Sequence, residues 1–226
     1  FGLPGQTTAQ ALADLQQAIR LEPAHLSWYE LTIEPNTWFH RHPPERPADD
    51  TLLVMQAQGQ ALLAEAGYQR YEVSAFARPA RQCRHNLNYW QFGDYLGIGA
   101  GAHAKITAAA PQTVQRIAKL KHPRSYIDSA HSAACISSCD ELSVADVILE
   151  CVMNSLRLDA GFSSAEFTTT TGLPWSRIEP RLNDAIEKGW LSENNGRIHT
   201  TPKGQRYLDE FLQQWLPEPS RHAETR

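Results

Sequence analysis

Hydrophobic residues recur at helical spacing in two stretches of the first 80 residues. They predict one helix over residues 8–21 and a longer helix over residues 49–67, which Gly67 ends. The apolar positions of these two helices are Leu12, Leu15, Ile19, Leu52, Met55, Leu62 and Leu63. Residues 26–33 and 71–76 are rich in aromatic and β-branched side chains, which predicts strands. Helix and strand therefore alternate, as in a parallel α/β layer.

The pattern changes after residue 140. Apolar residues at helical spacing predict helices over residues 144–158, 164–171 and 174–188. Asn195-Gly196 lies between two short runs of β-forming residues and predicts a hairpin. A last helix is predicted from Pro202, with an apolar stripe formed by Tyr207, Leu208, Phe211, Leu212, Trp215 and Leu216. Three helices, a hairpin and a final helix are the pattern of a winged-helix domain.

These patterns divide the chain into four parts. We expect residues 1–106 to form an α/β part and residues 140–216 to form the winged-helix-like domain. Residues 107–139 are rich in Ala, Ser and Pro with weak periodicity, so an irregular connector is expected there. Residues 217–226 are expected to be a flexible tail.

Composition and charge restrict the functions to consider. The chain has 226 residues, of which 42% are hydrophobic and 20% are charged, as is typical of a folded protein. A net charge of −4 argues against general affinity for nucleic acid or anionic membranes. The helix that would enter a DNA groove, within residues 173–188, has as many acidic as basic residues, so no nucleic-acid partner is expected. No apolar run reaches the ~18 residues of a transmembrane helix and no signal peptide is recognised, so a cytoplasmic location is expected.

The cysteines do not predict a disulfide framework or a metal site. Four irregularly spaced cysteines are expected to be free thiols: Cys83, Cys135, Cys139 and Cys151. Cys135 and Cys139 have the spacing that begins a C-x3-C-x2-C iron–sulfur motif. The third position is Leu142, so the motif is incomplete.

Residues 85–90, His-Asn-Leu-Asn-Tyr-Trp, concentrate groups that suit a flat aromatic macrocycle. His85 can ligate iron, Tyr89 and Trp90 can stack on a ring, and Asn86 can donate to a propionate. The alternative is that His85 is a packed or hydrogen-bonded residue without a ligand. No Ser-His-Asp triad, carboxylate pair or P-loop occurs at an informative spacing.

Residues 97–103, Gly-Ile-Gly-Ala-Gly-Ala-His, form a glycine-rich segment that we expect to be a strand. It matches a dinucleotide-binding fingerprint only loosely, because the residues that follow do not predict a helix. Alternating glycines would leave one strand face without side chains, so that a flat ligand or an adenosyl group can approach the backbone. A tight strand crossing without a ligand is the alternative.

Four landmarks, in order, resemble those of the oxygen-independent coproporphyrinogen III oxidase-like radical SAM family. They are Gly-Leu-Pro-Gly-Gln-Thr at 2–7, Leu-Ser-Trp-Tyr-Glu-Leu-Thr-Ile-Glu-Pro-Asn-Thr at 26–37, H-N-x-x-Y-W at 85–90 and G-I-G-x-G-A-H at 97–103. The H-N-x-x-Y-W element points to the heme-chaperone branch of the family. The resemblance spans residues 1 to about 216.

This resemblance implies an α/β fold, with the rear part of a partial (β/α)6 radical SAM barrel over residues 1–106, followed by a small helical winged-helix-like domain. Family members hold a [4Fe-4S] cluster and S-adenosylmethionine, and their cluster cysteines lie in the front half. We therefore expect a C-terminal fragment that does not assemble the cluster or catalyse radical chemistry alone. By position, Gly2, Thr32 and His103 are implied to lie near S-adenosylmethionine. The family commonly has Pro where this chain has Ala100, which leaves the substrate channel undefined there.

The resemblance also implies a role for residues 85–90. His85, Asn86, Tyr89 and Trp90 match the heme-binding motif, with His85 as the implied axial ligand of the heme iron. We expect a heme chaperone that binds heme and transfers it to a recipient hemoprotein, in peripheral contact at most with a membrane-bound recipient. The alternative is an oxygen-independent coproporphyrinogen III oxidase, which decarboxylates propionates by radical chemistry in porphyrin biosynthesis. A winged-helix module that binds nucleic acid is disfavoured by the balanced charge.

Overall fold

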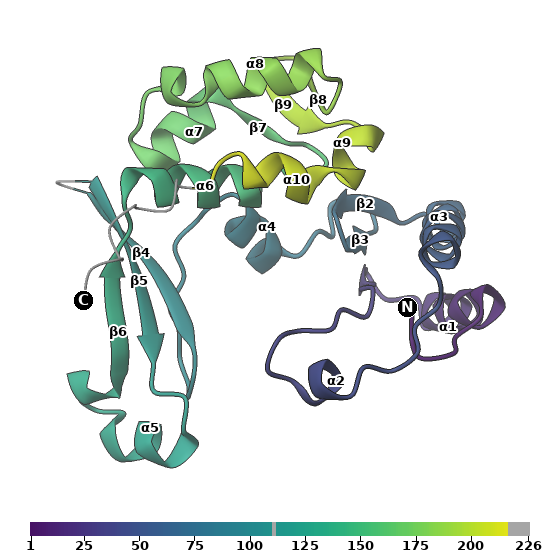
Figure 1. Ribbon diagram of the computed structural model, residues 1–226, viewed down its shortest axis with the longest axis horizontal. Helices are drawn as coiled ribbons and strands as arrows, with labels where there is room; N and C mark the ends of the chain where they lie inside the picture. Colours follow the sequence, from purple (N-terminus) through teal and green to yellow (C-terminus); the bar gives the residue numbers. More distant parts are fainter. Residues whose placement is uncertain (110–111, 217–226) are drawn as a thin grey trace, which may run out of the picture. The chain divides into compact units, whose positions relative to one another are not determined.

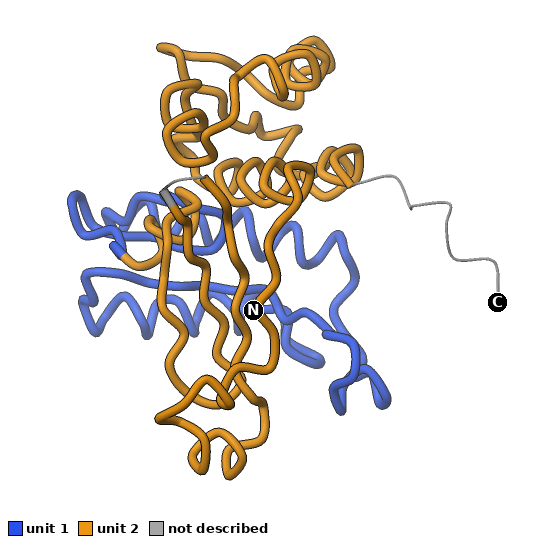
Figure 2. Tube along the Cα trace, turned by 90° about the vertical axis from the view of Figure 1, so that its left-hand side faces the viewer, with its two compact units in different colours: residues 1–84 blue, residues 85–226 orange. Residues whose placement is uncertain are grey.

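The computed structural model describes residues 1–109 and 112–216. The expected tail over residues 217–226 lies outside the described residues. Two compact units make up the chain, Phe1–Arg84 and His85–Arg226 (Figure 2), and each is described by itself.

The first unit contains two long helices and a three-stranded sheet (Figure 1). Its elements are α1 (Thr8–Arg20), β1 (His25–Ser27), α2 (Trp38–Arg41), α3 (Asp49–Glu65), β2 (Gln69–Glu72) and β3 (Ala75–Ala77). Both predicted helices are confirmed. Helix α1 begins with a capping box, in which Thr7 Oγ1 accepts from the Gln10 backbone N–H and Gln10 Oε1 accepts from the Thr7 N–H. The buried residues of the two helices are Ala11, Leu15, Leu52, Met55, Gly59 and Leu63.

Strand pairing in the first unit differs from the predicted parallel layer. The strand order is β1-β3-β2, and both outer strands run antiparallel to β3. A parallel pattern occurs at the start of the chain, where the Phe1 amino group donates to Tyr29 O at 2.6 Å and Leu31 N donates to Phe1 O at 2.8 Å. The alternation of helix and strand is therefore confirmed, whereas the direction of the three short strands is not.

Both predicted strands of this unit are shorter than expected. The strand predicted over residues 26–33 ends at Ser27, and the strand predicted over residues 71–76 is divided into β2 and β3 by a turn at Val73 and Ser74. Neither Gly nor Pro marks this turn, so composition alone does not indicate it.

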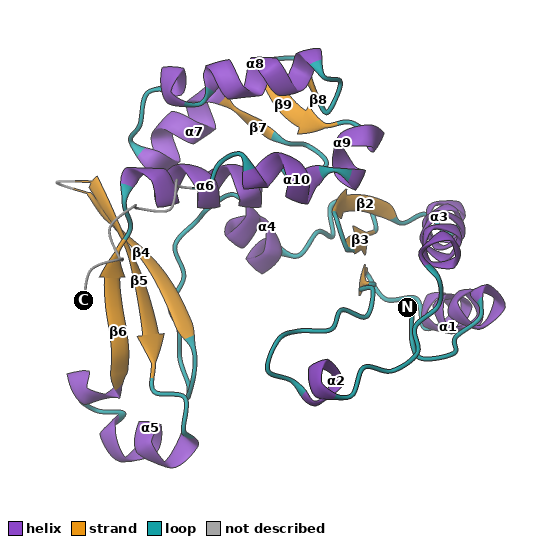
Figure 3. Ribbon diagram, viewed as in Figure 1, coloured by secondary structure: helices purple, strands orange, loops and turns teal. Residues whose placement is uncertain are grey.

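The second unit combines a β-sheet with a helical domain (Figure 3). Helix α4 (Arg84–Trp90) leads into it. The sheet region comprises β4 (His103–Ala109), β5 (Gln112–Lys119), α5 (Pro123–Ser129), a 3-10 turn (Ala133–Cys135) and β6 (Ile136–Glu141). The helical domain comprises α6 (Val144–Ser155), β7 (Phe162–Ser163), α7 (Ser164–Thr171), a 3-10 turn (Trp175–Arg177), α8 (Glu179–Glu187), β8 (Leu191–Asn194), β9 (Arg197–Thr200), α9 (Pro202–Arg206) and α10 (Leu208–Gln213).

Residues 107–139, for which the sequence predicts an irregular connector, instead form most of an antiparallel sheet. The order is β4-β5-β6, and β4 pairs with β5 along its full length, from His103 opposite Ala118 to Ala109 opposite Gln112. Residues with low β propensity, such as Ala118 and Ser138, weaken the sequence signal for strands in this region. Pairing and burial in the sheet, rather than intrinsic propensity, therefore determine these strands.

The helix and hairpin pattern predicted after residue 140 is confirmed. Helices α6, α7 and α8 precede the β8–β9 hairpin, and β7 completes a sheet of order β7-β9-β8. The hairpin turn has Asn195 and Gly196 at φ values of 51° and 72°, the left-handed conformation that this turn needs. The predicted last helix is interrupted at Tyr207 and forms α9 and α10.

One hydrophobic core joins the helical domain to the residues before it. Phe92, just after α4, is 0% exposed, and Val114 of β5 is 2% exposed. Both belong to the core formed by the helices and the hairpin, with Val147, Cys151, Val152, Leu156, Phe162, Phe167, Ile178, Leu182, Ala185, Leu191, Ile198, Leu208, Phe211 and Trp215. The end of α4 and the sheet are thus held by the core of the helical domain.

Replacing Val114 with Ala tests this shared core. Val114→Ala is expected to lower the free energy of unfolding by about 2 kcal/mol, because it removes buried methyl groups and leaves a cavity. Urea unfolding followed by tryptophan fluorescence measures the change. Val144→Ala, at a residue that is 49% exposed, is the matched control and should change the value by less than about 0.5 kcal/mol. Equal effects of the two substitutions would contradict a shared core.

Candidate functional site around helix α4

Helix α4 places the residues predicted to bind a macrocycle on different sides. His85 and Tyr89 are four residues apart and share one face, whereas Trp90 points to another side. His85 is exposed, while Asn86, Tyr89 and Trp90 are partly buried. Within the described part of the chain, no hydrogen bond or ion pair engages the His85 ring. The imidazole is therefore available to an external ligand.

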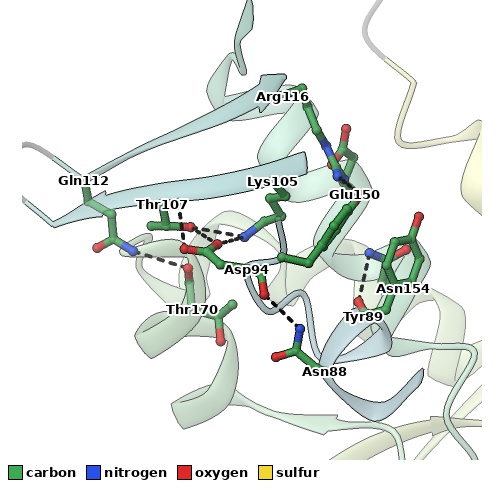
Figure 4. Close-up of polar contacts among 11 residues, drawn as sticks. Asn88, Tyr89, Asp94, Lys105, Thr107, Gln112, Arg116, Glu150, Asn154 and Thr170 are labelled. Carbon is green, nitrogen blue, oxygen red and sulfur yellow. Dashed lines mark hydrogen bonds and ion pairs between the residues drawn. The ribbon is translucent and has the colours of Figure 1, made fainter. Parts of the chain in front are cut away.

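The chain turns sharply where α4 ends. Phe92 has a φ of 59°, and Gly93 N donates to Asn88 O at 2.7 Å. Asn88 Nδ2 donates to Asp94 O at 2.9 Å (Figure 4). A Cβ on Gly93 would lie 2.3 Å from Asn88 Oδ1, so this position needs glycine. The turn lets Phe92 enter the core while α4 remains at the surface.

The Tyr89 ring packs against Tyr95, which is itself held by the Arg116–Glu150 ion pair. Its ring lies 5.4 Å from the ring of Tyr95, centroid to centroid, and Arg116 Nη1 donates to Tyr95 Oη at 2.7 Å. Arg116 also pairs with Glu150 of α6 (Figure 4). Burial raises the pKa of Tyr95. Burial opposes the charge of Arg116, but the hydrogen bond and attraction from Glu150 outweigh it and raise the arginine pKa.

A buried lysine fastens the segment after α4 to strand β4. The Lys105 side chain is 2% exposed, and its Nζ donates to Asp94 Oδ1 at 2.9 Å and lies 4.1 Å from the centre of the Phe92 ring. Asp94 also accepts from the N–H and the hydroxyl of Thr107, each at 2.8 Å. Burial alone would raise the pKa of Asp94, but the hydrogen bonds from Lys105 and Thr107 outweigh it and lower the pKa. Nothing local in the sequence pairs residues 94 and 105, so sequence patterns do not indicate this cluster.

Trp90 faces the helical domain. The Arg157 guanidinium lies 4.5 Å from the centre of the indole ring. Asn154 of α6 donates to the Tyr89 carbonyl at 3.4 Å. Trp90 is therefore engaged within the unit, whereas His85 is open.

The glycine-rich segment is not a strand over residues 97–103. Strand β4 begins at His103, and residues 96–102 form a loop. A Cβ on Gly97 would lie 2.3 Å from His103 O, so the protein's own backbone occupies the space that this glycine leaves. Gly99 has a φ of 113° and nothing within 4 Å of a Cβ position, so it alone of these two glycines leaves open space.

The residues expected near S-adenosylmethionine lie in both units. Gly2 is buried in the first unit, with a φ of 76° and its N–H donating to Gln6 Oε1 at 2.9 Å. Thr32 is exposed in the same unit and donates to Glu34 Oε1 at 2.9 Å. His103 begins β4 in the second unit. Their proximity to S-adenosylmethionine therefore stays a prediction.

The described residues do not fit an iron–sulfur cluster. No group of three or more His, Cys, Asp or Glu residues is arranged to hold a metal ion among residues 1–109 and 112–216. The four cysteines are free thiols, and Cys135 and Cys151 are buried. Burial raises the pKa of Cys151 to about 12, which keeps it a neutral thiol.

Candidate membrane-spanning helices are absent from the part of the chain that the structure describes. No helix there is both long enough and apolar enough to cross a bilayer.

A cavity that the sequence did not indicate lies beside the end of α4. Its volume is about 320 Å³. Its lining comes from α4, α6, α7 and the segments next to them: Asn88, Gln91, Gly93, Cys151, Ser155, Leu158, Gly161, Phe162, Glu166, Phe167 and Thr170. His85 is not part of this lining, so the cavity and the exposed imidazole are separate features.

Asp94→Asn tests the ion pair with buried Lys105. It is expected to lower the free energy of unfolding at pH 7 by about 2 kcal/mol, because Lys105 stays buried without its carboxylate partner, while the 41% exposure of the Asp94 side chain reduces the loss below that of a fully buried pair. The lowered pKa of Asp94 means that its carboxylate stabilises the native protein above about pH 4, the ordinary Asp value, and that this stability is lost as the pH falls through the folded value. The variant should therefore lose less stability on acidification. Urea unfolding at pH 7 and about pH 3 measures both effects.

The control for this prediction is an exposed ion pair. Asp184 and Lys188 lie 2.6 Å apart with side chains 52% and 45% exposed, so Asp184→Asn should cost less than about 1 kcal/mol. An Asp94→Asn variant as stable as this control would show that Lys105 does not depend on the carboxylate.

Comparison with known proteins places these features in a family. Residues 142–207 match the family model of the HemN C-terminal domain. Over 96% of its length the chain is 45% identical to the heme chaperone HemW of Escherichia coli strain K12 and 43% identical to that of Haemophilus influenzae. It is 28% identical to the mitochondrial radical S-adenosyl methionine domain-containing protein 1 of Mus musculus. The chain spans 56%, 55% and 52% of these relatives, about half of their length.

The fold is similar to that of a solved radical SAM enzyme. Coproporphyrinogen III oxidase (HemN) from Escherichia coli matches with a TM-score of 0.70 over 95% of this chain and 53% of that one, at 18% identity. This likeness confirms the predicted fold class, the rear part of a radical SAM barrel followed by a winged-helix-like domain. The sequence matches show that the chain belongs to the oxygen-independent coproporphyrinogen III oxidase-like radical SAM family, and its relatives at 45% and 43% identity are named heme chaperones.

Proposed function

We propose that this protein binds heme on the exposed face of α4 and transfers it to a recipient hemoprotein. The exposed imidazole of His85, which has no partner among the described residues, is the observation that carries this proposal. The relatives at 45% and 43% identity are named heme chaperones, which supports it.

The residues of α4 have different roles in this proposal. His85 supplies a ring nitrogen to the heme iron as its axial ligand. Tyr89 lies on the same helix face and offers aromatic surface beside the macrocycle. Asn86 is placed one residue after the ligand, where its amide can donate to a propionate. Trp90 supports the helix from inside, because its ring lies against Arg157.

The cofactors are proposed for the whole protein rather than for this chain. We infer that the whole protein holds S-adenosylmethionine and a [4Fe-4S] cluster, because a relative and the solved enzyme are named for radical S-adenosylmethionine chemistry. Gly2, Thr32 and His103 are proposed to lie near S-adenosylmethionine. The described residues offer no cluster site, so no radical step is assigned to them.

The proposed partners are heme and a recipient hemoprotein, in the cytoplasm. Free thiols at all four cysteines support a reducing compartment. A membrane-bound recipient would be met by peripheral contact. The balanced charge within residues 173–188 supports the proposal that the winged-helix-like domain does not bind nucleic acid.

Titration with hemin tests the proposed ligand. His85→Ala is expected to weaken hemin binding at least about tenfold and to shift the Soret band, because the iron loses its axial nitrogen. His131→Ala, at an exposed histidine in the same unit, is the matched control and should leave the affinity and the band unchanged. An unchanged spectrum and affinity for His85→Ala would refute the ligand assignment.

A second assay separates the chaperone from the oxidase. The whole protein, reconstituted under anaerobic conditions, is expected to bind heme without converting coproporphyrinogen III to protoporphyrinogen IX. Formation of that product would favour the oxidase, whose fold this chain shares.

A further inference from the structure

The orientation of α4 depends on contacts from outside the helix. It has seven residues, too few for an isolated helix to be stable in water. Its end is held by Phe92 in the core, but an anchor at one end leaves rotation about the helix axis undetermined. The direction in which His85 points must therefore be set by contacts along the helix.

One face of α6 and Arg157, two residues past its end, provide these contacts. Glu150, Asn154 and Arg157 recur at intervals of four and three residues, so they follow one side of this helix and its end. All three contact α4 or its direct support. Asn154 donates to the Tyr89 carbonyl and Glu150 pairs with Arg116 (Figure 4). Arg157 lies over the Trp90 ring.

These contacts reach two adjacent residues of α4 from different directions. The Tyr89 ring lies against Tyr95, whose hydroxyl accepts from Arg116, while the Tyr89 carbonyl accepts from Asn154. Trp90 is held through its ring face by Arg157 at 4.5 Å. A helix held at a ring, a carbonyl and a neighbouring indole cannot rotate about its axis without breaking at least one of these contacts.

The contacts of Asn154 and Arg157 with α4 leave several buried polar atoms without hydrogen-bond partners. Asn154 is 2% exposed, and its Oδ1 has no hydrogen-bond partner among the described residues; the same holds for Trp90 Nε1 and Arg157 Nε. Buried polar atoms without partners destabilise a fold, so apolar side chains would serve simple packing better. Directional polar contacts, unlike apolar packing, select one orientation of the helix.

We propose that Asn154 and Arg157 are positioning residues for heme binding, which fix the orientation of α4 so that His85 presents its ring nitrogen to the iron. This inference rests on the proposed heme-binding function and adds that the helical domain, rather than the motif alone, determines the geometry of the ligand. Glu150 supports the same helix indirectly through Arg116 and Tyr95.

Variants of the two positioning residues test the inference. Arg157→Ala and Asn154→Leu are expected to weaken hemin binding about tenfold and to shift the Soret band toward that of His85→Ala, because iron ligation becomes heterogeneous. Arg157→Lys keeps a cation near Trp90 and should restore part of the affinity. Thermal unfolding of each variant establishes that it is folded.

The matched control is a second arginine on a tryptophan of the same unit. Arg181 lies 5.1 Å from the centre of the Trp215 ring, and among the described residues no hydrogen bond, ion pair or ring contact joins it to α4. Arg181→Ala removes the same kind of contact and should leave hemin affinity and the Soret band unchanged. An equal loss of affinity in Arg157→Ala and Arg181→Ala would reduce the effect to general stability and overturn the inference.

Hydrogen–deuterium exchange without heme provides an independent readout. Residues 85–91 are expected to exchange at least about fivefold faster in Arg157→Ala and Asn154→Leu than in Arg181→Ala. Unchanged exchange would show that these residues do not hold α4, and faster exchange with unchanged hemin binding would show that its orientation does not matter to the ligand; either result overturns the inference. If either of these results overturns the inference but His85→Ala still weakens hemin binding at least about tenfold, the proposed function stands. If the unaltered protein does not bind hemin, both fail.

Discussion

The burial of Phe92 is the constraint on which the candidate site depends. Its ring is 0% exposed in the core of the helical domain, and its left-handed backbone conformation lets the chain leave α4 sharply. Because protein cores are densely packed, the ring cannot move without opening a void. The end of α4 and the start of the segment that leads to β4 are therefore fixed by an apolar contact with a domain that lies later in the sequence.

Polar contacts, in addition to the burial of Phe92, hold the chain next to α4 in place. Lys105 lies over the Phe92 ring and pairs with Asp94, and Arg116 joins Tyr95 to Glu150. In a partly buried environment such contacts are strong when every group is paired and costly when one is missing. They connect β4, β5 and α6 to the same short stretch of chain, so a change in any of these elements affects the helix that carries His85.

Helix α4 is held by contacts on one side and exposes His85 on another. Trp90 and the Tyr89 backbone are held from within the second unit, whereas His85 on the same helix is open to solvent. For the proposed role, this separation has a physical advantage. A ligand at the surface can be reached by a recipient protein, while the supported side of the helix keeps the imidazole oriented when heme is absent.

The sequence by itself determined the elements whose stabilising contacts join residues close together in the sequence. Helices α1, α3 and α6 and the β8–β9 hairpin at Asn195-Gly196 follow from periodicity, caps and turn residues within a few positions. Tertiary structure decided the antiparallel β4–β6 sheet, the loop at residues 96–102 and the partners of the site. The reason is sequence separation: Lys105 and Asp94 are 11 residues apart and Asn154 and Tyr89 are 65 apart, so only the folded chain brings them within hydrogen-bonding distance.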